Sequence, residues 1–283
     1  MQNKFKIIIQ YLAPQRALSW LSGLLCNCHW RWWKNWQINF LIKRYGADLQ
    51  TAQLEHIDDY PTFNSFFTRT LKPELRPIVQ GSKQIACPVD GTISQIGEIQ
   101  HELLFQAKGF YFNLTALMGG SETHANAFVA GNYATLYLAP KDYHRVHMPL
   151  TGILRETIYI PGKLFSVNQL TTEHIPQLFS RNERLVCLFD TAAGSMAVIL
   201  VGAMLVSSIQ TVWSKERVYA KTIKKTLYPN PIQIERGAEL GHFKMGSTVI
   251  VLFAKDVAEW SDQLQPAMTV KMGQLLGTLT FLK

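Results

Sequence analysis

The residues that could carry chemistry begin with a serine near the end of the chain. Ser247 follows Gly246 directly and precedes an apolar run over residues 249–253. Glycine leaves its carbonyl open to close approach, so the Ser247 hydroxyl stands beside a carbonyl that it could attack. The same pattern also fits a turn before a buried strand, with the serine bonded to the backbone. The local sequence leaves both interpretations open.

Two other segments hold residue types that activate a serine. Asp90 belongs to an Asp-Gly pair, and His144 and His147 lie three residues apart. A histidine takes the serine proton, and an aspartate orients the imidazole and stabilises its charged form. Asp90, a histidine and Ser247 therefore permit a charge-relay arrangement. The alternative for Asp90 is turn formation alone, which Asp-Gly pairs favour.

A metal centre is the other use of two histidines at this spacing. His144 and His147 would share a face if their segment were helical, but Pro149 makes a long helix there unfavourable. No HExxH motif and no evident third ligand lie nearby. The cysteines form neither a paired CxxC pattern nor a disulfide framework, which favours a reducing compartment. They are Cys26, Cys28, Cys87 and Cys187. We expect no metal.

A turn-rich loop over residues 160–168 is a candidate for holding a substrate headgroup. It contains Pro161 and Gly162, and its candidate contact residues are Lys163, Phe165 and Asn168. A loop of this composition could equally serve only to connect two strands.

Charge is concentrated at the start of the chain. Residues 1–47, which we call the arm, hold seven basic residues and no acidic one, out of a formal net charge of +8 for the whole chain. The remaining residues therefore carry 8 − 7 = +1. A basic arm can suit nucleic acid or an anionic membrane surface.

The arm is also rich in tryptophan, which prefers the headgroup level of a bilayer. Its tryptophans are Trp20, Trp30, Trp32, Trp33 and Trp36. An apolar stripe at helical spacing runs through Ala17, Leu21, Leu24, Cys28 and Trp32. The uncharged stretch over residues 17–30 is too short and polar to cross a bilayer, which needs roughly 20 apolar residues. We expect a helix lying in the interface, or a helix packed on the body or on a second subunit.

A short helix and several prolines mark the passage out of the N-terminal part. Thr62 is a suitable N-cap for a helix over residues 63–69, whose phenylalanines share one face. The prolines that follow predict extended chain and are Pro73, Pro77 and Pro88.

Beyond Cys87 the pattern is that of strands. Short runs of β-branched and aromatic residues are separated by turn residues, at residues 92–96, 134–138, 153–159, 185–189, 196–206, 248–254 and 278–282. The sequence therefore predicts an α+β fold: a helical, membrane-facing region over residues 1–72, followed by a β-rich, mostly antiparallel catalytic domain over residues 73–283.

Segments spread along nearly the whole chain resemble the phosphatidylserine decarboxylases of the proteobacterial type, which depend on a pyruvoyl group. The segments, in order, are TFNSFFTR with LRPI, PVDGTISQIG, FQAKG, YLAPKDYHRVHMP, GILRETIYIPGKLFSVN, RNERLVCLFDT, VGAMLVSSIQTVW and FKMGSTVIVLF. The usual processing motif in this family is LGST, and Met245 replaces its leucine here. This is a conservative apolar exchange that leaves the glycine and serine intact.

The resemblance implies roles for individual residues. Asp90, His147 and Ser247 would form the self-processing triad, and His144 would serve the later decarboxylation. Cleavage would fall between Gly246 and Ser247. It would leave a β chain of residues 1–246 and an α chain of residues 247–283 that begins with a pyruvoyl group made from the serine.

The resemblance also implies the activity and the partners. The pyruvoyl ketone would form a Schiff base with phosphatidylserine and take up the electrons left by CO2, giving phosphatidylethanolamine for phospholipid biosynthesis. Tyr137 lies in a matching segment and is a further substrate-binding candidate. The expected location is peripheral, on the cytoplasmic face of a bacterial cell membrane. The expected partners are an anionic phospholipid membrane and the paired α and β chains, with homodimers as in the family; nucleic acid is not expected.

Two other classes of function remain open on the residues alone. A Ser-His-Asp lipid hydrolase would use the same three side chains without cutting itself. A membrane-surface binding protein would need only the arm. The mass of the denatured chain distinguishes the decarboxylase from both, because only the decarboxylase consists of two polypeptides.

Overall fold

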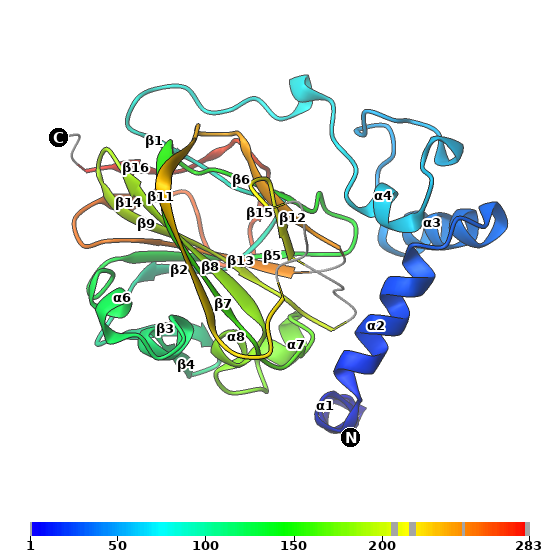
Figure 1. Ribbon diagram of the computed structural model, residues 1–283, viewed down its shortest axis with the longest axis horizontal. Helices are drawn as coiled ribbons and strands as arrows, with labels where there is room; N and C mark the ends of the chain where they lie inside the picture. Colours follow the sequence, from blue (N-terminus) through cyan, green and yellow to red (C-terminus); the bar gives the residue numbers. More distant parts are fainter. Residues whose placement is uncertain (1, 205–208, 215–218, 245–246, 281–283) are drawn as a thin grey trace.

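A single eight-stranded antiparallel sheet forms the centre of the body in this computed structural model, which describes residues 2–204, 209–214, 219–244 and 247–280 (Figure 1). In spatial order its strands are β11 (Lys224–Ile234), β7 (Gly152–Ile160), β8 (Arg184–Thr191), β9 (Gly194–Val201), β13 (Ser247–Phe253), β5 (Asn132–Leu138), β2 (Gly91–Glu98) and β15 (Thr269–Val270). These strands confirm the predicted antiparallel, β-rich body.

Three smaller sheets and four short helices surround this sheet. The sheets consist of β1 (Gln84–Ala86), β16 (Leu275–Leu279) and β14 (Ala258–Trp260); β10 (Ile209–Thr211), β12 (Glu239–Phe243) and β6 (Arg145–His147); and β3 (Leu103–Ala107) with β4 (Phe110–Asn113). The helices are α5 (Leu114–Leu117), α6 (Glu122–Asn126), α7 (Gln169–Thr172) and α8 (Leu178–Arg181). Figure 1 shows α6, α7 and α8 below the large sheet.

Strand β13 is the most deeply buried strand of the sheet. All seven of its residues, Ser247–Phe253, are buried, and it pairs with β9 on one side and β5 on the other. Its apolar residues are mostly β-branched, which suits a strand buried on both faces. The register pairs Ser247 with Leu138 and Thr248 with Val201. Ser247 therefore lies at one end of the sheet, where the chain enters its core.

The arm folds into three helices beside the body: α1 (Gln2–Leu12), α2 (Gln15–Cys26) and α3 (Arg31–Tyr45). The predicted stripe from Ala17 to Trp32 does not lie on one helix, because α2 ends before Asn27. The Asn27 side chain donates to the Gly23 carbonyl at 2.8 Å and satisfies a free carbonyl of the last turn. Trp32 therefore belongs to α3, and the prediction of a single continuous helix was wrong.

The short helix after the arm confirms its predicted cap. Helix α4 (Phe63–Phe67) begins after Thr62, whose side chain accepts from Ser65 N at 3.1 Å while Ser65 Oγ accepts from Thr62 N at 3.0 Å. This reciprocal pair satisfies two backbone donors at the helix start. Two 3₁₀ turns, Ile57–Asp59 and Pro73–Leu75, flank α4 in the connecting chain.

The arm and α4 share a small core of their own. It is separate from the large core of the body and contains Cys26, Ile38, Leu41, Ala47, Tyr60, Phe63, Phe66 and Phe67. Lys34 closes this core by donating to the carbonyls of Ile57 and Tyr60 at 2.9 and 2.8 Å. No helix within the described residues is long and apolar enough to span a bilayer.

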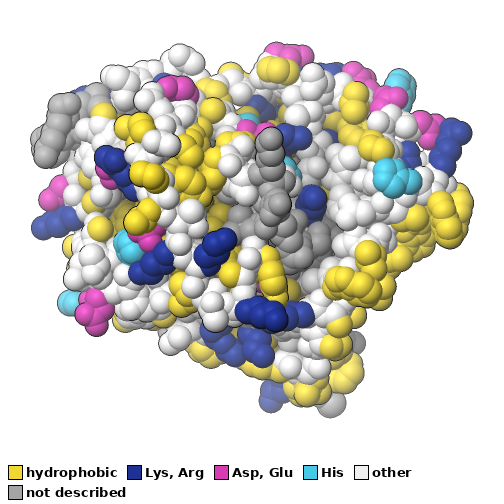
Figure 2. Space-filling model, viewed as in Figure 1, with side chains coloured by type: hydrophobic (Ala, Val, Ile, Leu, Met, Phe, Trp, Pro, Cys, Tyr) yellow, Lys and Arg dark blue, Asp and Glu magenta, His cyan; other side chains and the backbone are white. Residues whose placement is uncertain are grey.

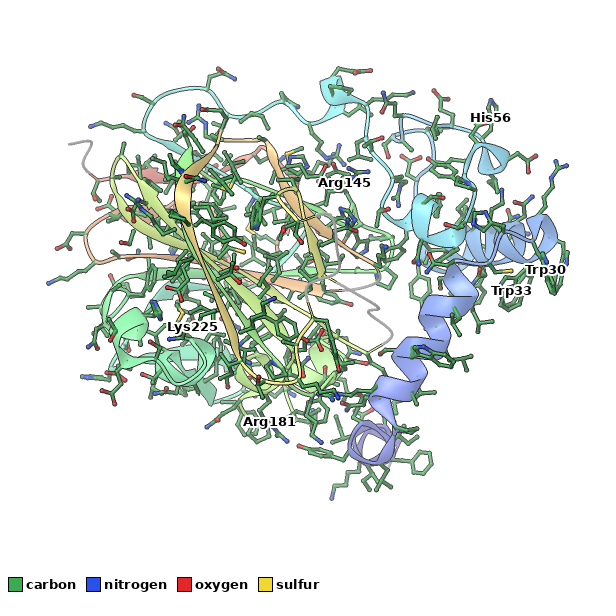
Figure 3. The ribbon with its side chains drawn as sticks, viewed as in Figure 1. Trp30, Trp33, His56, Arg145, Arg181 and Lys225 are labelled. Atoms are coloured by element: carbon green, nitrogen blue, oxygen red, sulfur yellow. The ribbon has the colours of Figure 1, made fainter. Side chains whose placement is uncertain are left out.

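The outer face of α3 carries a row of aromatic rings in contact. Successive ring centroids lie 5.1 to 6.3 Å apart, through Trp30, Trp32, Trp33, Trp36, Phe40 and Tyr45. Figure 3 shows Trp30 and Trp33 at the outer end of the arm. Figure 2 shows hydrophobic side chains gathered along the same edge of the molecule.

Candidate active site

Ser247 is buried without a hydrogen-bond partner for its hydroxyl. Its side chain is 0 % exposed, and Oγ makes no hydrogen bond within the described part of the chain. The neighbouring Thr248 hydroxyl is in the same state. A buried polar group without a partner typically costs about 1–3 kcal/mol. A catalytic role is one recognised explanation for such a group, and a nucleophile at Ser247 would fit it.

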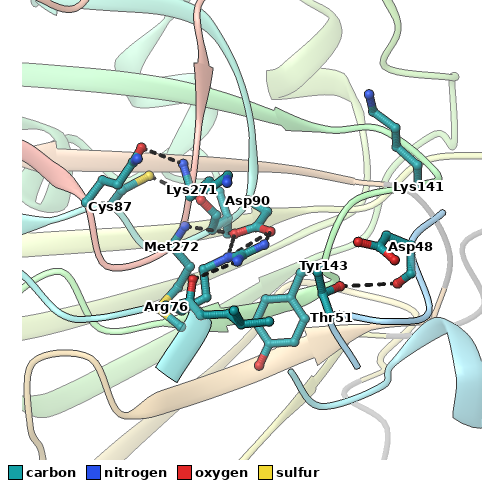
Figure 4. Close-up of polar contacts among 12 residues, drawn as sticks. Asp48, Thr51, Arg76, Cys87, Asp90, Lys141, Tyr143, Lys271 and Met272 are labelled. Atoms are coloured by element: carbon teal, nitrogen blue, oxygen red, sulfur yellow. Dashed lines mark hydrogen bonds and ion pairs between the residues drawn. The ribbon is translucent and has the colours of Figure 1, made fainter. Parts of the chain in front are cut away.

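Asp90 lies in the turn that leads into β2 and is held by an arginine. Arg76 Nε donates to Asp90 Oδ1 at 2.8 Å, and Arg76 Nη2 donates to Oδ2 at 2.5 Å (Figure 4). The backbone N–H of Met272 adds a bond to Oδ1 at 2.8 Å. The carboxylate is buried at 8 % exposure, so the bidentate arginine offsets its desolvation. The LRPI segment holds Arg76, but the residue types alone did not indicate this contact.

His147 ends β6 with both ring nitrogens engaged. Nδ1–H donates to the Gly237 carbonyl at 2.8 Å, and the Tyr143 hydroxyl donates to Nε2 at 3.0 Å. These partners assign the tautomer that carries its proton on Nδ1. Burial lowers the pKa of His147, with the nearby Arg145 acting in the same direction. The ring is therefore neutral at pH 7, and Nε2 is a basic nitrogen.

His144 is enclosed more completely than His147. Its ring stacks on Phe67 of α4 with centroids 4.0 Å apart, and Nε2–H donates to the Ala139 carbonyl at 3.0 Å. Nδ1 is buried and has no partner in the described residues. Burial, with a smaller contribution from the Arg69 charge, lowers the pKa of His144 to about 3. One face of this histidine thus depends on a helix outside the body.

The structure brings the predicted residues to one end of the sheet without joining them by hydrogen bonds. Asp90 bonds to Arg76, His147 bonds to Tyr143 and Gly237, and no hydrogen bond links Asp90, His147 and Ser247 within the described residues. Gly246 lies outside the described residues.

Of the two histidines, His144 bonds to backbone groups nearer to Ser247 and its strand partner than His147 does. Its carbonyl accepts from Phe243 N, at the end of β12 that precedes Ser247. Its ring contacts Ala139, which follows Leu138, the strand partner of Ser247. His147 pairs instead with Glu239, at the other end of β12.

The predicted substrate residues fall in three different places. Tyr137 lines a cavity of about 250 Å³ beside β2, and burial raises its pKa. Lys163 and Phe165 line a separate groove against the arm. The Asn168 side chain caps α7 by accepting from Thr171 N at 3.2 Å. A further cavity of about 240 Å³ touches Asp90.

The described residues fit a pyruvoyl group at position 247. Among these residues the Ser247 hydroxyl makes no bond that would be lost if it were converted, and Thr248 is fixed by strand pairing to both Tyr137 and Val201. A new chain end at this point would therefore stay in place. No cluster of three or more potential metal ligands occurs among the described residues.

Comparison with known proteins places the chain in a family. The family model described as phosphatidylserine decarboxylase matches residues 63–278, and a model described as PSD matches residues 5–46. The phosphatidylserine decarboxylase proenzyme of Ectopseudomonas mendocina is 51% identical over 282 residues, covering 98% of this chain and 99% of its own length. The proenzymes of Pseudomonas putida strain GB-1 and Pseudomonas fluorescens strain Pf0-1 are each 50% identical over 281 residues, covering 98% of both chains. The chain therefore belongs to the phosphatidylserine decarboxylase family.

Proposed function

We propose that this chain is the precursor of a phosphatidylserine decarboxylase that cuts itself between Gly246 and Ser247. The mature enzyme converts phosphatidylserine to phosphatidylethanolamine and CO2 with a pyruvoyl group derived from Ser247. Family membership supports the activity. The observation that carries the cleavage site is the fully buried Ser247 hydroxyl at the head of β13, which has no hydrogen-bond partner among the described residues.

In self-processing, Ser247 Oγ attacks the carbonyl carbon of Gly246 and His147 accepts the hydroxyl proton. The C–N bond between Gly246 and Ser247 then breaks, and the freed amine takes up a proton, which leaves an ester. Elimination of the Gly246 carboxylate from this ester gives a dehydroalanine, and its hydrolysis releases ammonia and leaves the pyruvoyl group.

His147 suits the role of proton acceptor because Nδ1–H is fixed on Gly237 and the neutral Nε2 is basic. Tyr143, which donates to Nε2, must give up this bond as the serine approaches. Burial sets the lowered pKa of His147, and the Gly237 carbonyl, the Glu239 charge and, least of the three, the Asp90 charge act against it. Asp90 thus helps to stabilise the imidazolium without a hydrogen bond to it.

In decarboxylation, a pyruvoyl group supplies a ketone and an electron sink for the pair left when CO2 departs. His144 delivers the proton that then reaches the α-carbon. The ring starts neutral, with Nδ1 open to accept a proton. An anionic headgroup beside the ring would raise its pKa by charge and so favour uptake of a proton at Nδ1 when substrate binds. Tyr137, which pairs with Thr248 and lines a cavity beside β2, contacts the headgroup.

The arm holds the enzyme on the cytoplasmic face of the membrane as a peripheral protein. Its exposed rings enter the headgroup region and its basic residues attract anionic lipid. The substrate reaches the site from this surface. The two chains formed by cleavage remain paired through β13, and pairs of this unit form homodimers.

Denaturing mass spectrometry of the purified protein tests the proposal. The expected result is two polypeptides in place of one of 32.2 kDa, the smaller having 283 − 247 + 1 = 37 residues and a blocked N-terminus. Ser247→Ala should remain one chain without decarboxylase activity. Thr135→Val removes another buried hydroxyl, on β5, that has no partner in the described part of the chain, and it should cleave normally. Decarboxylation by uncleaved Ser247→Ala would refute the mechanism.

A further inference from the structure

A cavity of about 720 Å³ lies between the arm and the body, away from Ser247. The corner between α1 and α2 forms one wall, and the loop after β7 and the end of α8 form the other. We call it the basic groove and define it by Tyr11, Arg16, Lys163, Phe165, Arg181 and Lys221. The proposed chemistry makes no use of it.

Hydrogen bonds fix the two walls of the basic groove against each other. Gln15 Oε1 accepts from Leu164 N at 2.7 Å, and Gln10 Oε1 accepts from Ser166 N at 3.0 Å. The Gln15 side chain is buried and also donates to the Gln10 carbonyl at 2.7 Å. These bonds satisfy backbone groups of the loop with side chains of the arm, so the groove is formed before any ligand arrives.

The charge of the basic groove is of one sign. Four cationic side chains line it, no acidic residue occurs among its described lining residues, and none of the four has an ion pair within the described residues. Its cations are Arg16, Lys163, Arg181 and Lys221. Helix α2 also begins here, after Pro14 and without an acidic residue in its first turn, which adds positive partial charge. Converging charges of one sign attract a counter-ion.

Arg181 shows how the groove would hold such an anion. Its guanidinium lies over the rings of Tyr11 and Phe165, 5.6 and 4.9 Å from their centroids. Its contacts to oxygen are long, 3.5 Å to the Tyr11 hydroxyl and 3.4 Å to the Pro176 carbonyl. The rings fix the plane of the guanidinium and leave its donors weakly used, which suits a bidentate contact to phosphate. Figure 3 shows Arg181 at the edge of the body that faces α1.

The position of the groove indicates the source of the phosphate. The adjoining helices expose Leu12, Trp20 and Leu21 at 77, 67 and 47 %. A membrane that receives these side chains would bring its headgroup phosphates to the level of the groove. Figure 2 shows Lys and Arg side chains gathered low on the face, beside the hydrophobic edge.

The substrate's own phosphate cannot fill the groove while its serine is at position 247. The groove loop follows β7, three strands from β13, a lateral distance of about 14 Å at the usual strand spacing. The phosphate of phosphatidylserine lies only a few bonds from the reacting nitrogen. We propose that the basic groove binds the phosphate of a second anionic phospholipid, which is not decarboxylated and docks the junction of arm and body on the membrane.

Acetylation of lysines in the full-length protein tests this proposal without using decarboxylation. Phosphatidylglycerol mixed into phosphatidylcholine vesicles should slow acetylation of Lys163 and Lys221 about fivefold relative to phosphatidylcholine alone. Lys225, exposed on β11 outside the groove, is the internal reference and should change little. Equal protection of Lys225, or no protection of the groove lysines, would overturn the site. Equal protection by inorganic phosphate with phosphatidylcholine vesicles would overturn the lipid source.

Matched charge variants give an independent measurement. Arg16→Gln/Lys163→Gln/Lys221→Gln should reduce the gain in vesicle flotation that phosphatidylglycerol provides by about tenfold or more. Lys43→Gln/Arg44→Gln/Lys225→Gln removes the same charge outside the groove and should reduce it less. Flotation on phosphatidylcholine alone reports the apolar arm and should be equal in both. Equal losses in both variants would show that only net charge matters and would refute the site.

Discussion

The arm and the body contain the same kinds of large apolar residue and treat them in opposite ways. In the body Phe112, Ile199 and Phe253 are 0 % exposed, whereas in the arm Trp20 and Trp32 are 67 % exposed. Exposed apolar patches of this extent mark surfaces that meet a partner or a membrane. The body thus buries its large apolar side chains in its own core, whereas the arm leaves several of its own exposed. Under the proposed function, the arm determines where the protein binds, and the body holds the residues of its chemistry.

The largest expected effects come from replacing His147 and His144, which should act on different steps. His147→Ala should stop self-cleavage, because it removes the basic nitrogen that accepts the serine proton. His144→Ala should still cleave but decarboxylate about 10²–10⁴-fold more slowly, the usual contribution of one acid–base group. Mass spectrometry reads the first effect and CO2 release the second. Loss of cleavage in His144→Ala would mean that the roles are exchanged, as its closer approach to the Ser247 strand would permit.

The next effect belongs to the arm alone. Replacing Trp20, Trp30, Trp32 and Trp36 by serine should reduce flotation on vesicles about a hundredfold, since these rings are the exposed ones. Self-cleavage should proceed as in the parent chain, because the buried Ser247 lies in the separate core of the body. A variant that still floats normally on vesicles, or one that fails to cleave itself, would contradict the separate roles of arm and body.

Two Arg–Asp ion pairs of the body, Arg76–Asp90 and Arg155–Asp190, differ in how deeply they are buried. Arg76→Ala leaves Asp90 charged and enclosed, so it should lower the free energy of unfolding by about 3–5 kcal/mol. Arg155→Ala breaks a surface pair with Asp190, which is about half exposed, and should cost no more than about 1 kcal/mol. Urea unfolding of both variants in a Ser247→Ala chain gives the comparison. Equal losses would show that Asp90 is not held as we describe.

The smallest effect is a pH dependence at the contact between arm and body. Burial lowers the pKa of His144 to about 3 in the folded state, against about 6.5 when unfolded, so the unfolded chain binds more protons between these values. Stability should therefore fall as pH drops below about 6.5, by about 1.4 kcal/mol per pH unit. His144→Gln should flatten this slope, and His174→Gln, at an exposed site, should not. Urea unfolding midpoints measured between pH 5 and 7 test this, and an equal slope in the parent chain and in His144→Gln would contradict it.

Local patterns predicted the elements better than the contacts between them. The strand segments followed from runs of β-branched and aromatic residues between turn residues, and the Thr62 cap followed from capping chemistry; both depend on neighbouring residues. The break after Cys26 was missed because Asn27 acts through its own side chain on Gly23, inside an unbroken apolar spacing. Boundaries of this kind depend on single hydrogen bonds that a periodic pattern does not contain.

The site shows the same limit at longer range. Asp90, His144, His147 and Ser247 stood out by type and motif, and the structure gathers them at one end of the sheet. The partners of these residues did not stand out, because Arg76 and Phe67 reach them from distant segments. The position of His147 is likewise set by the register of β6 against β12, and spacing along the chain carries no information about register.

The burial of β13 decides what becomes of the protein after a cut at its first residue. A 37-residue fragment would hold the middle strand of the sheet, paired along its length to β9 and β5 on the other fragment. Neither fragment could leave without opening the core, so the two fragments would stay together in any separation that keeps the protein native. If the small fragment were synthesised separately, the large fragment would already have closed the gap between β9 and β5 that β13 occupies. The intact chain must therefore fold before it is cut, and the cut protein could not be assembled from its two separate fragments.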